Sequence, residues 1–326
     1  MKLPAEVVKV FEGIKSMRIR GAGRIARAAA RALEVAAKGY EGSEEGLLDY
    51  LVYVANYLKS SRPTAVSLPN ALNYVLSRVK AAKDRGIMPL KEVALKAARE
   101  FINYSLRAVE IIGEIGAKRV KDGDVILTHC NSSAALSIII KAWREGKEVK
   151  VYATETRPKF QGYLTFKTLS SKGIPARLIP DSAVRYFMKD VDKVILGADA
   201  VAANGAVVNK IGTSLIALSA HEARVRVFIA AETYKFSPFT LFGELVTIEE
   251  RDPREVVNSD YLLANPGIKV RNPAFDVTPP EYIDAIITER GIIAPQAASL
   301  VLMEEYGRAI GGCLIKVTVD MEDEGL

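Results

Sequence analysis

Residues 125–133 read Val125-Ile126-Leu127-Thr128-His129-Cys130-Asn131-Ser132-Ser133 and pass from apolar β-forming residues into polar ones. This is the pattern of a short buried strand that ends just before a helix. Similar apolar runs follow at 149–153, 176–179, 193–196 and 225–230, with helical segments between most of them. Strands that are apolar throughout and alternate with helices are typical of a mainly parallel sheet covered on both faces. We therefore predict an α/β fold for this part of the chain.

The chain before residue 118 has a different pattern and reads as helices. Apolar residues recur there at helical spacing in four segments, 23–38, 43–59, 70–85 and 89–115. Ser43 is a suitable N-cap for the second segment. We predict two domains, a helical domain over residues 1–119 and an α/β domain over residues 120–326.

Composition and cysteine count indicate a globular protein without a membrane span, a signal peptide or a disulfide framework. The chain has 326 residues, of which 49% are hydrophobic and 26% charged, an ordinary globular balance. No stretch approaches the roughly 18 consecutive apolar residues of a membrane span, and Glu6 and Lys9 interrupt the N-terminal apolar run, so we expect no signal peptide. Cys130 and Cys313 are the only cysteines, so we expect no disulfide framework and a reduced, cytoplasmic protein. No metal-binding motif is present, and we expect neither a metal nor a cofactor.

The positive charge is concentrated in the first third of the chain. Residues 1–120 hold 21 Lys and Arg against 12 Asp and Glu, whereas the remainder holds 24 against 27. The excess begins with Arg18, Arg20, Arg24, Arg27 and Arg31. This asymmetry indicates an anionic partner, the alternative being a solvated helical surface. We expect no nucleic acid, because no basic segment has interleaved aromatic residues, whereas a phosphorylated small molecule needs only two or three convergent arginines.

Polar residues follow each predicted strand, at the positions where ligands bind in parallel sheets. These strand ends are residues 128–133, 154–158, 180–182, 197–200 and 231–235. Each of them is polar and potentially reactive. We therefore expect the functional site at the carboxyl edge of the sheet.

Cys130 lies between a strand and the helix after it. A thiol close to a helix N-terminus can have a lowered pKa, which would make it reactive; the alternative is a buried, inert cysteine. His129 is adjacent, but neighbouring strand residues point to opposite faces. We therefore interpret His129 as structural rather than as the base partner of Cys130.

Three further residues follow strands and could act on a ligand. Asp199 lies among small residues in Gly197-Ala198-Asp199, which leaves room for a ligand, although a turn or N-cap role is the alternative. Lys210 precedes a predicted helix, and together with the amides at the start of that helix it could bind a phosphate. Lys235 could add another positive charge.

Gly21-Ala22-Gly23-Arg24-Ile25-Ala26 fits the dinucleotide-binding pattern GxGxxA. The residues before it form a poor strand and no acidic residue stands at the expected strand end, so we reject a nicotinamide site. Two glycines before an alanine-rich helix can still expose backbone N–H groups to a phosphate, with Arg20 and Arg24 or Arg27 adding charge. The alternative is a plain turn before a helix.

Several motifs, taken as an ordered set, resemble a known superfamily. They are Arg20-Gly21-Ala22-Gly23, Arg62-Pro63-Thr64-Ala65, Thr128-His129-Cys130, Gly197-Ala198-Asp199, Asn209-Lys210-Ile211-Gly212-Thr213, Ala231-Glu232-Thr233-Tyr234-Lys235-Phe236 and Asn272-Pro273-Ala274-Phe275-Asp276-Val277-Thr278-Pro279-Pro280. From about Val7 to Gly307 the chain resembles the initiation factor 2B α/β/δ subunits and the methylthioribose-1-phosphate isomerases. Within that superfamily it is most similar to the archaeal ribose-1,5-bisphosphate isomerases.

The resemblance implies a helical N-terminal domain, a Rossmann-like domain, and isomerisation of α-D-ribose 1,5-bisphosphate to D-ribulose 1,5-bisphosphate in the salvage of AMP ribose. It also implies activation by AMP and assembly into dimers and then hexamers. Carried over by motif, Cys130 would be the proton acceptor and Asp199 the proton donor. The substrate-binding residues would be Arg20, Gly21, Ala22, Gly23, Arg62, Ser132, Ser133, Ala134, Asn209, Lys210 and Lys235.

The chain departs from the family pattern in one segment, and two other functions are alternatives to the bisphosphate isomerase. Relatives can have a basic residue after the cysteine, where this chain has Asn131-Ser132-Ser133. A methylthioribose-1-phosphate isomerase would need a pocket for an apolar thioether, whereas the basic residues here favour two phosphates. A non-catalytic regulatory subunit would have no need for both Cys130 and Asp199.

Overall fold

A computed structural model of the chain describes residues 3–242 and 246–305. Its first part is helical, as expected. The helices are α1 (Ala5–Lys15), α2 (Ala22–Lys38), α3 (Glu44–Lys59), α4 (Ser67–Asp84) and α5 (Leu90–Ala117). Ser43 is the N-cap of α3, and its side chain accepts a hydrogen bond from the backbone N–H of Gly46. All four predicted helical segments are confirmed.

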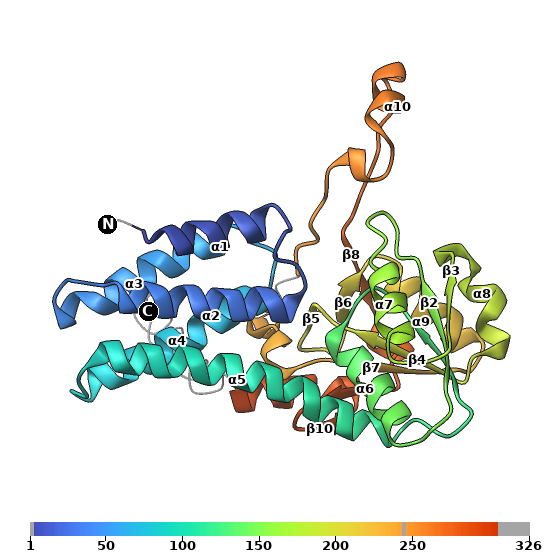
Figure 1. Cartoon of the computed structure of the whole chain (residues 1–326), viewed down its shortest axis with the longest axis horizontal. Helices are drawn as coiled ribbons and strands as arrows, with labels where there is room; N and C mark the ends of the chain where they lie inside the picture. Colours follow the sequence, from blue (N-terminus) through green and yellow to red (C-terminus); the bar gives the residue numbers. More distant parts are fainter. Residues whose placement is uncertain (1–2, 243–245, 306–326) are drawn as a thin grey trace, which may run out of the picture.

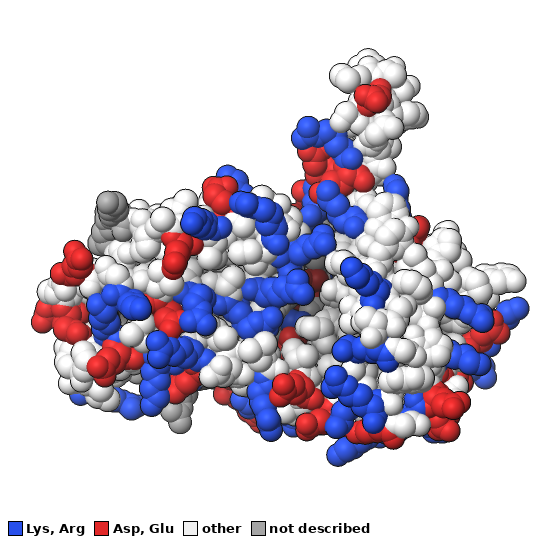
Figure 2. Space-filling model, viewed as in Figure 1, with Lys and Arg blue, Asp and Glu red and all other residues white. Residues whose placement is uncertain are grey.

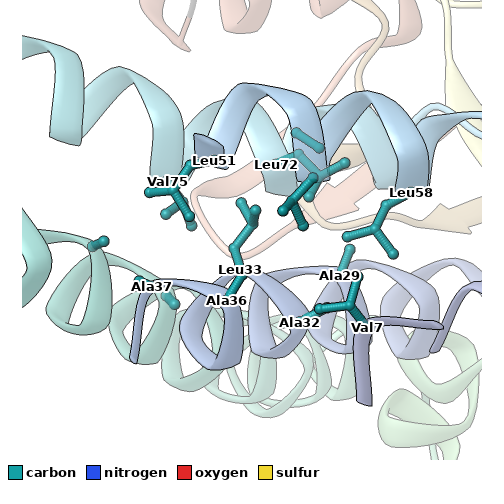
Figure 3. Packing of buried hydrophobic residues seen from close by; sticks show 14 of the residues in the cluster. Val7, Ala29, Ala32, Leu33, Ala36, Ala37, Leu51, Leu58, Leu72 and Val75 are labelled. Carbon is teal, nitrogen blue, oxygen red and sulfur yellow. The ribbon is translucent and has the colours of Figure 1, made fainter. Parts of the chain in front are cut away.

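Alanines on α2 let the neighbouring helices pack closely. Ala29, Ala36 and Leu33 have no exposed surface and belong to a cluster to which α1, α3, α4 and α5 also contribute. Figure 3 shows these α2 residues facing leucines of α3 and α4, among them Leu51 and Leu72. Burying leucine side chains stabilises a fold by about 1.5–3 kcal/mol each. The helical region therefore has a core of its own.

The second part alternates strands and helices. The strands are β1 (Val125–Thr128), β2 (Lys150–Thr154), β3 (Ala176–Ile179), β4 (Lys193–Gly197), β5 (Ala200–Val201), β6 (Val207–Lys210), β7 (Arg226–Ala230), β8 (Phe275–Thr278), β9 (Ala285–Thr288) and β10 (Gly291–Ile293). The helices are α6 (Ser133–Arg144), α7 (Gly162–Ser170), α8 (Val184–Phe187), α9 (Thr213–Glu222) and α10 (Ser259–Ala264). The five strands expected from apolar runs are all present.

Seven of these strands form one sheet in the order β10-β9-β7-β4-β1-β2-β3. All neighbours pair in parallel except β10 and β9. Apolar residues of α6 and α7 pack in one buried cluster, and those of α8 and α9 pack in another. The chain thus folds as a helical region followed by a Rossmann-like, mainly parallel α/β region.

The strand order reverses direction between β1 and β4. From β1 the chain moves outward to β2 and β3, then returns to β4 on the other side of β1. The loops after these two strands therefore diverge and leave a crevice, which is where ligands bind in open α/β sheets. A small antiparallel sheet, β5-β6-β8, follows β4 and lies at the same edge.

Figure 1 shows how the two regions lie relative to each other. Helix α5 runs along both, from the helical bundle to the neighbourhood of α6 and β10, and residues 250–273 project from the body as an arm that carries α10. Helix α5 ends at Ala117 and β1 begins at Val125; a domain boundary at residues 119 and 120 stays a prediction. In the described part of the chain, no helix is long and apolar enough to cross a membrane.

Candidate active site

The largest group of predicted site residues lies around one cavity between the start of α2, the carboxyl ends of β1, β4 and β6, and the base of the arm. Figure 2 shows Lys and Arg side chains gathered around the hollow between the helical region and the sheet region. The cavity is lined by Met17, Arg20, Gly21, Ala22, Gly23, Arg24, Arg62, Cys130, Asn131, Ser132, Ser133, Gln161, Leu164, Ala198, Asp199, Asn209, Lys210, Lys235, Arg251 and Phe275. Every predicted site residue except Ala134 is in this set.

Ala134 is the exception because its side chain has no exposed surface and packs in the core beneath α6. Ser132 is the N-cap of that helix, and its hydroxyl accepts a hydrogen bond from the backbone N–H of Ala135. Ala134 therefore does not line the cavity, and its predicted place in the substrate site is not supported.

Cys130 follows β1 directly and has a φ of 63°, in the left-handed region that non-glycine residues rarely occupy. Two threonines hold this conformation. The N–H of Cys130 donates to Thr156 Oγ1 over 2.9 Å, and Thr165 Oγ1 donates to the Cys130 carbonyl oxygen over 2.6 Å. A strained residue held by its neighbours is a frequent feature of functional sites.

The expectation of a lowered thiol pKa is wrong. Burial raises the pKa of Cys130 to about 11, and the carboxylate of Asp199 raises it as well. The positive charges of Lys210 and Arg20 act in the opposite direction, as does the backbone N–H of Asn131. Helix α6 begins at Ser133, after Cys130, and burial of the thiol outweighs the nearby groups that favour the thiolate. Cys313, the other cysteine, lies outside the described residues.

His129 is structural, as its position in the strand predicted. Its Nε2 lies 2.9 Å from the carbonyl oxygen of Ile211 and must donate to it, so the neutral ring presents Nδ1 as an acceptor, 2.6 Å from Thr154 Oγ1. Burial lowers the pKa of His129 to about 4. A neutral imidazole with both nitrogens bonded to the protein joins β1 to β2 and to the loop after β6.

Asp199 follows β4, the strand beside β1, and its N–H donates to the carbonyl oxygen of Val208 over 2.9 Å. Gly197 allows this loop to approach the loop after β1, since a Cβ on Gly197 would lie 2.3 Å from Ser132 Oγ. The structure thus brings Asp199 and Cys130 to the same cavity from two adjacent strands, one on each side of the crevice.

The Gly21–Gly23 segment opens a helix toward the cavity, as predicted. Gly21 is the N-cap of α2 and has a φ of 88°, a conformation that suits glycine. Because Gly21 has no side chain to cap the helix, the N–H groups of the first turn remain available to an anion. Arg20 and Arg24 line the cavity beside them, whereas Arg27 donates to Ser105 Oγ over 3.0 Å.

The start of α9 does not provide the predicted second phosphate site. The N–H groups of Gly212 and Ser214 both donate to Asp276 Oδ2, over 2.7 and 3.1 Å. This carboxylate therefore occupies the anion position at that helix N-terminus. Lys210 itself does line the cavity; its Nζ donates to the Ala274 carbonyl oxygen over 2.8 Å and lies over the ring of Phe275.

Two of the predicted cations are buried and paired with glutamates. Arg62 contacts Glu249 through Nη2 at 3.0 Å and through Nε at 3.1 Å. Lys235 pairs with Glu232 at 2.6 Å, and neither side chain is more than 6% exposed. Both cations line the cavity, whereas Glu249 and Glu232 are not among its lining residues. The two glutamates therefore hold the positively charged side chains in place at the cavity wall.

Sequence reasoning missed several lining residues, above all Arg251, Gln161 and Phe275. Arg251 and Phe275 do not follow a strand of the main sheet. Gln161 is the N-cap of α7, at the end of the turn after β2, so the rule on strand ends finds none of the three. Within residues 3–242 and 246–305, no group of histidine, cysteine, aspartate and glutamate side chains is placed to hold a metal ion.

The fold and the site together define a class of protein, a Rossmann-like α/β region with a helical N-terminal region and, between them, a cavity lined by several Lys and Arg side chains. Residues 18–295 match the model of the initiation factor 2 subunit family, and the chain belongs to that family. It is 54% identical to a ribose 1,5-bisphosphate isomerase from Thermococcus kodakarensis over 95% of this chain and 98% of that relative.

More distant relatives include other activities. A methylthioribose-1-phosphate isomerase from Acetivibrio thermocellus is 40% identical over 88% of each chain. Among solved structures, a translation initiation factor eIF-2B from Pyrococcus horikoshii superposes with a TM-score of 0.77 and 33% identity, over 90% of this chain and 98% of that one.

Proposed function

We propose that this chain is an aldose–ketose isomerase that converts α-D-ribose 1,5-bisphosphate to D-ribulose 1,5-bisphosphate. One observation carries the proposal. A thiol and a carboxylate from adjacent strands line one cavity together with buried cations. The similarity to ribose 1,5-bisphosphate isomerases at 54% identity supports the same substrate.

The chemistry requires two proton-transferring groups. A sugar phosphorylated at O1 cannot open to a free aldehyde, so the C2 proton must leave as the bond from C1 to the ring oxygen breaks. We assign the base to Cys130 and the acid to Asp199, which protonates the ring oxygen. The product of this step is the enol with a double bond between C1 and C2.

Return of the protons completes the isomerisation. Cys130 gives its proton to C1, and the enol hydroxyl on C2 loses its proton to the Asp199 carboxylate. This leaves a ketone at C2 and restores both residues, so that no net proton is gained or lost. Lys210 has a specific part in this scheme, because its charge favours the thiolate that burial disfavours.

The phosphates would be held by the remaining lining groups. Backbone N–H groups at the start of α2, with Arg20 and Lys235 nearby, form one anion site. Arg62 and Lys210, which both lie over the ring of Phe275, form another. Ser132, Ser133 and Asn209 add polar groups to the lining. In this proposal, the hydroxyls and amide of Asn131-Ser132-Ser133 take the place of the basic residue that relatives can have after the cysteine.

Two alternatives predict different outcomes in one assay. The protein is incubated with ribose 1,5-bisphosphate or with methylthioribose 1-phosphate, and the ketose product is followed by 13C NMR at C2. We expect turnover of the bisphosphate and a much lower kcat/KM for the thioether substrate. The reverse preference would favour a methylthioribose-1-phosphate isomerase, and a folded protein inactive on both would favour a regulatory subunit.

Three further expectations, on cellular setting, activation and assembly, extend this proposal. A reduced cytoplasmic setting suits a thiol base, because disulfides are rare there. We further propose activation by AMP and assembly into dimers and hexamers, as the family resemblance implies. Assays with and without AMP, and light scattering of the purified protein, test these two points separately from the isomerase activity.

A further inference from the structure

Arg251 is the second residue of the arm, next to the bridge between Glu250 and Pro273 that marks the base of the arm. Its N–H donates to the carbonyl oxygen of Asn272 over 2.9 Å, which closes the base of the arm. Its side chain is only 7% exposed and lines the same cavity as Cys130 and Asp199. The proton transfers proposed for Cys130 and Asp199 do not involve Arg251.

The guanidinium of Arg251 is only partly satisfied by protein. Nη2 lies 3.2 Å from Glu249 Oε1 and 3.1 Å from the sulfur of Met17, and Nη1 lies 3.8 Å from Glu255 Oε1. Nε is buried and has no hydrogen-bond partner among the described residues. A buried donor without a partner carries a substantial desolvation cost, which an arriving anion would remove.

Glu249 joins Arg251 to Arg62. One carboxylate oxygen contacts Arg62 at 3.0 Å, and the other contacts Arg251 at 3.2 Å. The two guanidiniums are thereby held next to each other. Both also act on Lys210, whose pKa is lowered by burial and, to a smaller extent, by their charges. Three cations thus gather at the end of the cavity near Phe275.

Two further cations of the cavity lining, Arg20 and Lys235, lie at the start of α2. A Cβ on Gly23 would lie 3.0 Å from Tyr234 Oη and 3.6 Å from Glu232 Oε1, and Glu232 pairs with Lys235. Lys235 is therefore next to the open start of α2. Two separate cationic groups match a substrate with a phosphate at each end, since guanidinium forks bind phosphate oxygens in pairs.

We propose that Arg251 binds one of the two substrate phosphates, together with Arg62 and Lys210, and so contributes to the preference for a bisphosphate over a monophosphate. This inference rests on the proposed function. It assigns a binding role to a residue of the arm, so that the arm forms part of the substrate site.

The test measures binding of three probes by isothermal titration calorimetry: ribulose 1,5-bisphosphate, ribose 1-phosphate and ribose 5-phosphate. In Arg251→Gln we expect the affinity for the bisphosphate to fall on the order of tenfold to a hundredfold, the size of a lost charge-assisted contact. Affinity for one monophosphate should fall as well, whereas the other, whose phosphate binds near α2, should be unchanged. Arg251→Lys should recover part of the loss, because it keeps the charge without the fork.

Two control variants separate direct binding from indirect effects. Arg254→Ala removes a positive charge from the arm at an exposed ion pair with Asp252. Lys159→Ala removes the 3.1 Å pair with Glu255 that ties the arm to the loop after β2. Both controls should bind all three probes as the wild type does.

Two results would overturn the proposal: wild-type affinity for the bisphosphate in Arg251→Gln, or an equal loss in Lys159→Ala. The first would show that Arg251 does not contact the phosphate, and the second that it only positions the arm. If the wild-type protein itself binds the bisphosphate no better than the monophosphates, the proposed function fails instead. Circular dichroism of each variant confirms that it is folded.

Discussion

At the scale of the residue, the protonation state of the Cys130 thiol depends on the balance between burial and nearby charges. Burial raises the pKa of its thiol, and Lys210 opposes that rise. In the free protein the thiol form therefore predominates at neutral pH. A substrate that is held close to the sulfur therefore meets a base whose reactivity depends on the groups that favour the thiolate, of which Lys210 has the largest effect.

The rate at which iodoacetamide alkylates Cys130 should depend on pH in a way that reports the raised pKa of the thiol. With a pKa of about 11, the rate should rise about tenfold per pH unit between pH 8 and pH 10, because only the thiolate reacts. Lys210→Met should react more slowly at each pH. Mass spectrometry of the peptide that contains Cys130 measures this rate independently of Cys313. A rate that levels off below pH 9 would mean that the thiol is already ionised there.

Asp199→Asn should remove the acid without disturbing the fold. We expect kcat to fall on the order of 10²–10⁴-fold, with KM changed by only a few-fold, because the phosphate contacts remain. Asp190→Asn, at an exposed carboxylate outside the cavity, is the control. Near-normal kcat in Asp199→Asn would assign the acid role to another group.

At the scale of the element, Asp276 connects β8 to the start of α9. Its carboxylate accepts N–H groups from Gly212 and Ser214, while its other oxygen, Oδ1, is buried without a hydrogen-bond partner among the described residues. Burial raises the pKa of Asp276 to about 6, although these N–H groups and Lys210 lower it. The same contacts position the turn that follows Lys210, the last residue of β6.

This raised pKa predicts a pH-dependent contribution to stability. A carboxyl group whose pKa is higher in the folded than in the unfolded chain favours folding below about pH 4, and that contribution is lost as the pH rises through 6. Relative to Asp276→Asn, the wild type should lose roughly 2–3 kcal/mol of unfolding free energy between pH 4 and pH 7. Urea denaturation of both proteins across this range measures the difference. A constant difference would mean that Asp276 titrates normally.

At the scale of the whole molecule, the helical region supports the site in the sheet region. The Asn70 side chain on α4 donates to the carbonyl oxygens of Tyr234 and Phe236, over 2.9 and 3.0 Å, on either side of Lys235. From α5, Tyr104 contacts Thr233 and Glu289. The segment with Lys235 is thus held between two regions that are far apart in the sequence.

Asn70→Ala should therefore affect both stability and substrate binding. Two buried carbonyl groups would lose their donor, which should reduce the unfolding free energy by about 1–3 kcal/mol, and KM should rise because Lys235 is less well held. Asn73→Ala, one turn along on the exposed side of α4, is the matched control. An unchanged KM in Asn70→Ala would show that Glu232 alone is enough to hold Lys235.

Much of the fold could be predicted because it depends on local patterns. The runs 125–128 and 193–196 are apolar and rich in β-formers, and both are strands of the parallel sheet. The strand-end rule located Cys130 and Asp199 without any knowledge of the strand order. It could not find Arg251, which reaches the cavity from an arm outside the main sheet.

Local patterns are enough to specify the helical and α/β regions, the strands and the polar residues that follow them, because hydrophobic periodicity acts over a few neighbouring residues. Only the tertiary structure decided that β4 lies beside β1, that Asp276 occupies the helix start expected to bind phosphate, and that the Cys130 pKa is raised rather than lowered. These features depend on burial and on charges brought together from distant segments. Such effects act through space and cannot be predicted from the residues adjacent in the sequence.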